Sequence, residues 1–226
     1  MDFFVTKIDD GYGGFMYELT GAGYVAFIAI ILMLVCVAAL LRKNKSGAKM
    51  TTLQIAFSGA AMALAFVTST YCKLFEMPMG GSVTLFSMLF IVLIAYWYGL
   101  KTGLMVGVAY GLLQMIIDPY IISLPQMLCD YPLAFGALGL AGLFSNKKWG
   151  LQIGYVVAVF GRFVFAVLSG VIFFASYAPD GMNPLWYSVA YNGGYLLAEA
   201  VITLVIICIP AVAKAMKQVK NMANEK

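Results

Sequence analysis

Residues 150–174 read GLQIGYVVAVFGRFVFAVLSGVIFF, a run in which only Arg162 carries a charge. A helix needs about 20 apolar residues to cross the hydrocarbon core of a bilayer, so this stretch is long enough to span it. Comparable runs lie at residues 19–41, 50–72, 83–99, 102–117, 121–144 and 187–213. The sequence therefore predicts an all-α polytopic membrane protein with seven spanning helices.

The overall composition supports this class. Of the 226 residues, 63% are hydrophobic and 11% are charged, and the mean hydropathy is +0.92. A soluble domain has about 25% charged residues. No hydrophilic stretch is long enough for a second, soluble domain, so apolar side chains must face lipid as well as a protein core.

The basic residues indicate the orientation in the membrane. With the N-terminus outside and the helices alternating, eleven of the fourteen Lys and Arg residues fall in cytoplasmic segments: Arg42, Lys43, Lys45, Lys49, Lys101, Lys147, Lys148, Lys214, Lys217, Lys220 and Lys226. An excess of Lys and Arg in cytoplasmic loops is the usual determinant of topology. We therefore expect a multi-pass protein of the cell membrane with a cytoplasmic C-terminus.

Three regions follow from the spacing of charge. Residues 1–49 form an outside N-terminal segment, an extra transmembrane helix and a basic linker. Residues 50–213 form a membrane domain of six helices, and residues 214–226 form a basic cytoplasmic tail. The first helix contains no ionisable residue and precedes the polar stretch Arg42–Lys49, which sets it apart from the other six.

Three ionisable residues, Asp130, Arg162 and Glu199, fall inside predicted helices at similar depth. Such groups are costly in a bilayer and usually face a bundle interior, a cavity or each other. We expect Arg162 and Glu199 to form a structural ion pair. Asp130 would then be an unpaired carboxylate that a cationic ligand could neutralise.

Aromatic and amide residues occur at comparable outer depth. Tyr120 and Tyr131 lie near Asp130, and Tyr187 and Asn192 follow the loop between the last two predicted helices. Aromatic rings attract cations over their faces, and amide and phenol groups orient polar heterocycles. This combination predicts a small-molecule pocket.

The residues that are missing limit the chemistry. The chain has no histidine, the commonest general base and metal ligand, and its four cysteines form no C-x-x-C pair. It also lacks the G-x-x-x-x-G-K-[ST] loop that binds nucleotide phosphates. We expect no catalytic residues, no metal, no cofactor and no ATPase activity of its own.

The helix predicted at 50–72 has a ridge of small residues, which are Ala56, Ser58, Gly59, Ala60, Ala61, Ala63 and Ala65. Small residues let helices approach closely in lipid. The ridge could pack against helices of the same chain or against a partner membrane protein.

Three segments carry a resemblance to a known family: KLFEMPMGGSVTLFSM (73–88), YGLLQMIIDPYIISLPQMLCDYPLAFGALGLAGLF (110–144) and LSGVIFFASYAPDGMNPLWYSVAYNGGYLL (168–197). Together they resemble the thiamine-specific substrate-binding (S) component of energy-coupling-factor (ECF) transporters. The resemblance implies that residues 50–213 form a six-helix S-component bundle, preceded here by one additional helix. It also implies capture of thiamine at the extracellular side and delivery with a transmembrane coupling subunit and two ATPases.

The resemblance extends to single residues. It implies that thiamine is bound by Asp130, Tyr131, Tyr120, Phe174, Tyr187 and Asn192, with Phe174 stacking on the ligand. It also implies that Ala61 and Ala65 contact the coupling subunit.

One position departs from the family pattern. The family commonly has a histidine four residues after the basic position of Arg162, and this chain has Ala166. A related aminopyrimidine or thiazole compound is therefore an alternative ligand. Two alternatives from other classes are an intramembrane enzyme that uses Asp130 and Glu199, and a structural membrane protein whose buried charges only fix helix packing.

Overall fold

A computed structural model describes residues 3–9, 15–26, 29, 50–77 and 81–224 of the chain. Residues 21–26 are helical. Most of the predicted helix at 19–41, and the basic linker after it, lie outside the described residues.

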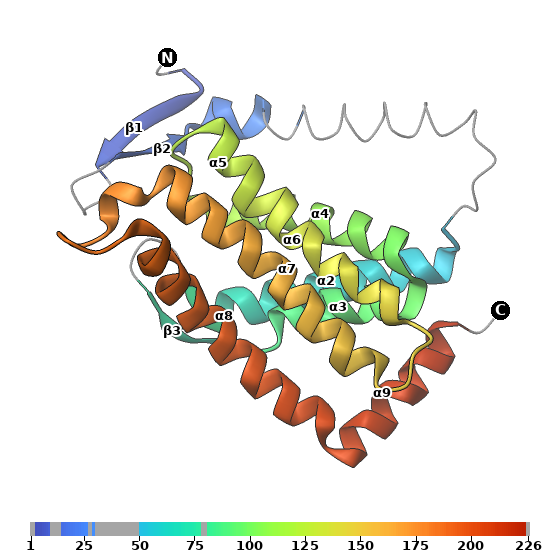
Figure 1. The fold of residues 1–226 in the computed structure, drawn as a ribbon. Helices are drawn as coiled ribbons and strands as arrows, with labels where there is room; N and C mark the ends of the chain where they lie inside the picture. Colours follow the sequence, from blue (N-terminus) through green and yellow to red (C-terminus); the bar gives the residue numbers. More distant parts are fainter. Residues whose placement is uncertain (1–2, 10–14, 27–28, 30–49, 78–80, 225–226) are drawn as a thin grey trace.

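Within the described residues, six apolar helical segments form the bundle (Figure 1). They are α2 (Thr52–Tyr71), α3 (Ser87–Tyr98), α4 (Leu100–Ile117), a compound segment at Leu124–Phe144, α7 (Gly150–Phe173) and α8 (Pro184–Cys208). Five of them are long and apolar enough to cross a membrane, and α3, with 12 residues, is shorter. The prediction of an all-α polytopic membrane protein is confirmed.

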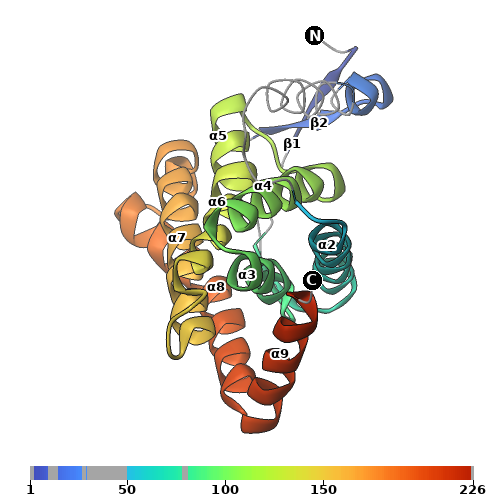
Figure 2. The same cartoon turned by 90° about the vertical axis from the view of Figure 1, so that its right-hand side faces the viewer.

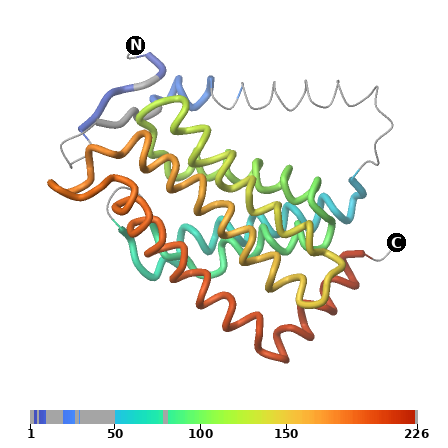
Figure 3. The backbone as a smooth tube through the Cα atoms, in the orientation of Figure 1, coloured from blue at the N-terminus to red at the C-terminus, as the bar shows by residue number. Residues whose placement is uncertain are grey.

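The part of the chain that the structure describes also has two small antiparallel hairpins. β1 (Val5–Asp9) pairs with β2 (Phe15–Leu19), and β3 (Lys73–Glu76) pairs with β4 (Ser82–Thr84). The second hairpin explains why α3 begins at Ser87 instead of residue 83, because Ser82–Thr84 are hydrogen-bonded to β3. It lies at the end of the bundle where α8 begins (Figure 3).

The core centres on α3, which lies between α2, α4 and α7 (Figure 2). Its side chains Met88, Ile91, Val92 and Ile94 are completely buried. Helix α4 packs closely on the compound segment through glycines; a Cβ at Gly107 would lie 2.5 Å from the Phe135 carbonyl oxygen. Small residues at helix contacts permit such close backbone packing in membranes.

Large apolar side chains cover the outside of the bundle. On α2, α7 and α8 they include Ile55, Leu64, Val67, Ile153, Val156, Phe160, Leu197, Val201 and Val205. A soluble protein rarely exposes so continuous an apolar surface, whereas lipid tails accept it. The outer surface is therefore suited to a bilayer.

The compound segment is not a uniform helix. It consists of α5 (Leu124–Leu128), a π-helical turn (Cys129–Leu133), α6 (Ala134–Gly136) and a 3₁₀ stretch (Ala137–Phe144). Pro132 lies within the π turn, where its missing N–H and its ring disfavour a regular α-helix. Asp130 and Tyr131 are therefore presented by a widened turn.

The last helix, α9 (Pro210–Ala223), occupies most of the predicted basic tail. Helix α8 ends at Cys208, shortly before the proline, and the chain turns back beneath the bundle (Figure 1). The Lys220 Nζ donates a hydrogen bond to the Ser145 carbonyl at 2.5 Å and lies 3.9 Å from the centre of the Tyr96 ring. The surrounding side chains lower the pKa of Lys220 by desolvation. These contacts fix α9 to the end of the bundle opposite the β3–β4 hairpin.

Candidate ligand-binding site

A cavity of about 320 Å³ lies between α4, the compound segment, α7 and α8, next to the β3–β4 hairpin. Its volume is in the range of small-molecule sites. The wall includes all six residues predicted to bind ligand, Asp130, Tyr131, Tyr120, Phe174, Tyr187 and Asn192. The structure thus brings together side chains from two distant parts of the sequence.

The Asp130 carboxylate is half-buried in the cavity wall. Its Oδ2 accepts a hydrogen bond from the Gln126 Nε2 at 2.6 Å. In the part of the chain that the structure describes, both ion pairs within 4.0 Å involve Lys73. Asp130 is therefore held by a neutral donor and keeps its charge available for a ligand.

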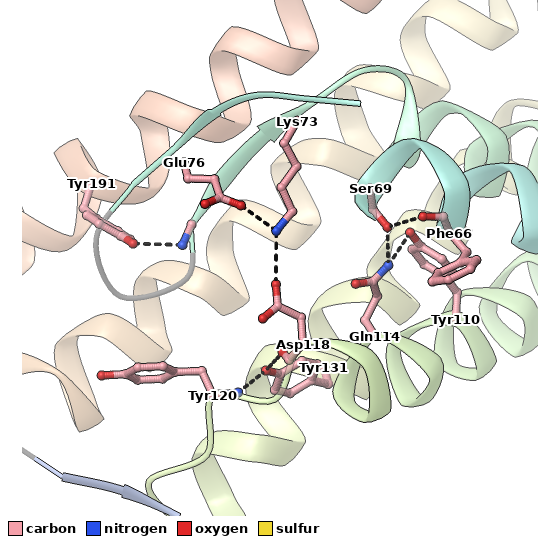
Figure 4. A network of polar contacts seen from close by, with 11 residues as sticks. Phe66, Ser69, Lys73, Glu76, Tyr110, Gln114, Asp118, Tyr120, Tyr131 and Tyr191 are labelled. Carbon is pink, nitrogen blue, oxygen red and sulfur yellow. Dashed lines mark hydrogen bonds and ion pairs between the residues drawn. The ribbon is translucent and has the colours of Figure 1, made fainter. Parts of the chain in front are cut away.

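Tyr131 lines the cavity, but its hydroxyl group is committed to the turn between α4 and α5. It donates to the Asp118 carbonyl at 2.9 Å and accepts from the Tyr120 backbone N–H at 2.7 Å (Figure 4). Any contribution to ligand binding must come mainly from the phenol ring. The hydroxyl fixes the position of Tyr120.

Aromatic rings form two groups along the cavity. Tyr120 and Phe174 have ring centroids 5.8 Å apart, which joins the α4–α5 turn to the end of α7. On α8, Tyr187 lies 6.1 Å from Tyr191, which lies 6.0 Å from Tyr195. Aromatic surface thus faces the cavity from both halves of the chain.

The Asn192 side chain is 7% exposed and links α8 to α7. Its Nδ2 donates to the Ser188 and Ala166 carbonyl oxygens at 3.0 and 3.3 Å, and its Oδ1 accepts from the Tyr195 hydroxyl at 2.9 Å. These bonds fix the orientation of the amide. Ala166, the position of the family histidine, also lines the cavity.

The predicted ion pair between Arg162 and Glu199 is wrong. Glu199 accepts hydrogen bonds from the Thr84 hydroxyl at 2.7 Å, the Met88 N–H at 3.1 Å and the Ser87 hydroxyl at 3.2 Å. The Arg162 guanidinium instead lies 4.0 Å from the centre of the Phe135 ring. The carboxylate has no need of a counter-ion because the corner between β4 and α3 supplies its donors.

The predicted docking role of Ala61 and Ala65 also requires correction. The two side chains are 7% and 0% exposed, because this face of α2 packs inside the bundle. The exposed small residues of α2 are Ala56, Gly59, Ala60 and Ala63, and a Cβ at Gly59 would meet nothing within 4 Å. Of the two small-residue faces of α2, this second one is the exposed face.

Several cavity residues were not predicted from the sequence, including Gln114, Gln126, Tyr191 and Tyr195. The spacing held a signal for three of them. Gln126 precedes Asp130 by four residues, and Tyr191 and Tyr195 follow Tyr187 at intervals of four, so each shares a helix face with a predicted residue. For Gln114 the sequence offered no comparable signal.

The β3–β4 hairpin is tied to residues of the cavity wall at two points (Figure 4). The Lys73 Nζ lies 2.7 Å from the Glu76 carboxylate and 3.5 Å from the Asp118 carboxylate. The Gly81 N–H donates to the Tyr191 hydroxyl at 3.0 Å. The hydrogen bond to Glu76, followed by the charge of Asp118, raises the pKa of Lys73 above its usual value of 10.5.

The fold and the cavity define a class, the polytopic membrane proteins that enclose a ligand-sized cavity within a helical bundle. Within that class, residues 55–219 match the family described as Thiamine transporter protein (Thia_YuaJ). The chain belongs to this family.

Individual relatives agree with this assignment. The chain is 35% identical to the thiamine transporter ThiT of Bacillus subtilis, over 74% of this chain and 92% of the relative. It is 28% identical to ThiT of Lacticaseibacillus paracasei, over 52% of this chain and 67% of the relative. A solved structure of ThiT from Listeria monocytogenes matches with a TM-score of 0.53 at 21% identity, covering 70% of this chain and 93% of that one, which supports the same fold.

Proposed function

We propose that the chain is the substrate-binding component of a thiamine uptake transporter of the cell membrane. The observation that carries the proposal is the cavity itself, in which the carboxylate of Asp130 has no cationic partner within 4.0 Å among the described residues and aromatic rings lie on both sides. The family name and the curated relatives support thiamine as the ligand. Asp130, Phe174, Tyr187 and Asn192 are the residues that we expect to contact it, with Tyr120 and Tyr131 completing the wall.

The charge of the cavity distinguishes thiamine from its neutral precursors. Three carboxylates and two cationic groups line the cavity and leave one net negative charge; they are Asp118, Asp130, Glu199, Lys73 and Arg162. The thiazolium ring of thiamine carries one permanent positive charge. At an effective dielectric constant of about 20, two charges about 4 Å apart attract by about 4 kcal/mol before desolvation is counted. Neither an isolated aminopyrimidine nor an uncharged thiazole gains this energy.

The proposal includes the coupling to transport. The end of the cavity beside the β3–β4 hairpin would face the outside, because exposed lysines gather at the other ends of the helices and would face the cytoplasm. They are Lys101 at the start of α4, Lys147 and Lys148 just before α7, and Lys214 and Lys217 on α9. A transmembrane coupling subunit with two ATPases would supply the energy. Its contact would be the exposed face of α2 at Ala56, Gly59, Ala60 and Ala63.

Isothermal titration of the purified protein tests the function. Thiamine should bind at one site and be recovered unchanged, and a neutral hydroxyethylthiazole or aminomethylpyrimidine should bind much more weakly. Conversion of thiamine would favour the enzyme alternative, and absence of binding to all three compounds would favour a purely structural protein. Tighter binding of a neutral compound than of thiamine would favour the related-heterocycle alternative.

A further inference from the structure

Gln126 is a buried polar residue beside the candidate ligand carboxylate. Its side chain is 1% exposed and uses both ends of its amide group. The Oε1 accepts from the Ile122 N–H at 3.1 Å, and the Nε2 donates to the Tyr120 carbonyl at 3.0 Å and to the Asp130 Oδ2 at 2.6 Å.

These partners determine which way the amide points. A backbone N–H can only donate and a backbone carbonyl can only accept, so exchanging the oxygen and nitrogen of Gln126 would break the bonds to both Ile122 and Tyr120. The Ser123 hydroxyl also accepts from the Gln126 backbone N–H at 3.3 Å, which fixes the start of α5. The second N–H of the amide is therefore aimed at Asp130.

A glutamine in this place fixes a carboxylate without neutralising it. A lysine or arginine could hold Asp130 equally well, but its charge would cancel the attraction for a cationic ligand. The neutral amide binds Oδ2 without adding a positive charge, and no Lys or Arg nitrogen of the described residues lies within 4.0 Å of the carboxylate.

The same amide joins the acid to the aromatic wall. Through the Tyr120 carbonyl it holds the turn whose tyrosine ring lies 5.8 Å from the Phe174 ring, while the Tyr131 hydroxyl holds the Tyr120 N–H. The carboxylate and the aromatic surface are thus set at a fixed separation by one side chain.

We propose that Gln126 is a positioning residue for cation binding. It holds the Asp130 carboxylate and the Tyr120 turn in the positions from which both contact the positively charged ring of the ligand. This inference rests on the proposed function, because it requires Asp130 to contact thiamine.

A double-mutant cycle on the full-length protein tests the inference. Thiamine affinity is measured by titration for the parent, Gln126→Leu, Asp130→Asn and the double variant. Because a hydrogen bond to a charged group contributes strongly to the position of that group, we expect Gln126→Leu to weaken thiamine binding about ten-fold or more. Because Gln126 acts in part through Asp130, the loss of affinity in the double variant should be smaller than the sum of the two single losses.

Two further variants distinguish a loss of thiamine binding from a loss of folding. Gln152→Leu removes a helical glutamine whose Nε2 donates to the Ile207 carbonyl away from the cavity, so it should bind thiamine like the parent. Gln126→Met keeps an unbranched side chain of similar length and should show the same loss of thiamine affinity as Gln126→Leu. Affinities are compared at a temperature at which thermal unfolding shows every variant to be folded.

The outcomes separate this inference from the proposed function. Losses that add in the double variant, or parent-like affinity in both Gln126 variants while Asp130→Asn binds weakly, would overturn the role of Gln126. Parent-like affinity of Asp130→Asn would instead overturn the site assignment on which the inference rests.

Discussion

At the scale of single residues, Glu199 is buried with no Lys or Arg nitrogen of the described residues within 4.0 Å of its carboxylate. Its carboxylate is 3% exposed and is surrounded by donors from Thr84, Ser87 and Met88, all from the corner between β4 and α3. A buried charge is tolerated when its lone pairs are satisfied by hydrogen bonds. Glu199 therefore attaches the last membrane helix to the hairpin and to α3.

We predict that Glu199→Ala destabilises the ligand-free protein by roughly 1.5–3 kcal/mol, because the Met88 N–H and the hydroxyls lose a charged acceptor. Thr203→Val is the matched control one turn further along α8. The Thr203 hydroxyl is buried and has no hydrogen-bond partner among the described residues, so its removal should be neutral or stabilising. Thermal unfolding in detergent measures both, and equal stability of Glu199→Ala and the parent would contradict this account of Glu199.

The sequence could place Glu199 and Arg162 at equal depth but could not show which way they point. Depth follows from the rise of 1.5 Å per residue, whereas direction around the helix axis depends on how α7 and α8 pack. The donors of Glu199 come from residues more than 100 positions away, in a hairpin that the apolar pattern did not reveal. The predicted ion pair failed for this reason.

At the scale of elements, α2 has two small-residue faces with different roles. Ala61 and Ala65 pack inside the bundle, and Ala56, Ala60 and Ala63 are exposed beside Gly59. The sequence revealed the ridge but not its division, because alanine occurs equally well in both environments.

We predict that Ala60→Trp abolishes thiamine uptake in cells while the purified protein still binds thiamine with parent affinity. The matched variant Ala61→Trp should instead impair folding, because a large side chain has no room at a buried contact and overpacking costs about 1–3 kcal/mol or more. Uptake assays, titration and thermal unfolding distinguish the two variants. Normal uptake by Ala60→Trp would remove this face from the proposed docking surface.

The β3–β4 hairpin is tied to the α4–α5 turn by Lys73, and this tie has a defined pH dependence. Because Glu76 and Asp118 raise the pKa of Lys73 in the folded state, its contribution to stability is fully present below pH 10.5 and is lost as the pH rises through the higher folded value. Because the ion pairs of Lys73 are partly exposed, they contribute at most about 1 kcal/mol to the free energy of unfolding.

We predict that Lys73→Gln lowers stability slightly at pH 8 and that the difference from the parent disappears above pH 10.5 as the parent lysine loses its charge. Lys148→Gln, an exposed lysine at the other end of the bundle for which the structure gives no ion pair, serves as the control and should be neutral at both pH values. Denaturation at pH 8 and at alkaline pH provides the comparison. If the stability difference between Lys73→Gln and the parent grew as the pH rose, this account of the ion pair would be contradicted.

The segment at 121–144 was predicted as one helix, and its position is correct within a few residues. Its internal irregularity was not predicted. Pro132 signals a break, but neither the π turn nor its effect on the direction of Asp130 follows from a local sequence pattern. Turns of this kind are common at functional sites, where they redirect a side chain.

At the scale of the whole molecule, the six core helices could be predicted because length and hydropathy decide membrane insertion. The site could be predicted in part, since its six residues were identified by family resemblance and do line one cavity. The hairpins and α9 escaped prediction because a strand of three to five residues and a short amphipathic helix carry weak signals in an apolar chain.

The predicted topology is open to a direct test by cysteine accessibility. In a cysteine-free background, a cysteine at Lys148 should react with an impermeant reagent only from the cytoplasmic side, and one at Asp180 only from the outside. Both positions are exposed and lie in loops at opposite ends of α7. Labelling of Lys148→Cys by the impermeant reagent in intact cells would show that the orientation is the reverse of the predicted one.

The central claim is that the charge of Asp130 recognises the positive charge of thiamine, and titration of Asp130→Asn tests it most directly. Asparagine keeps the size and the hydrogen-bond acceptor but removes the charge. We predict at least about ten-fold weaker thiamine binding, or about 1.4 kcal/mol, with little change for a neutral thiazole analogue. Thiamine binding by Asp130→Asn with the affinity of the parent would contradict the account.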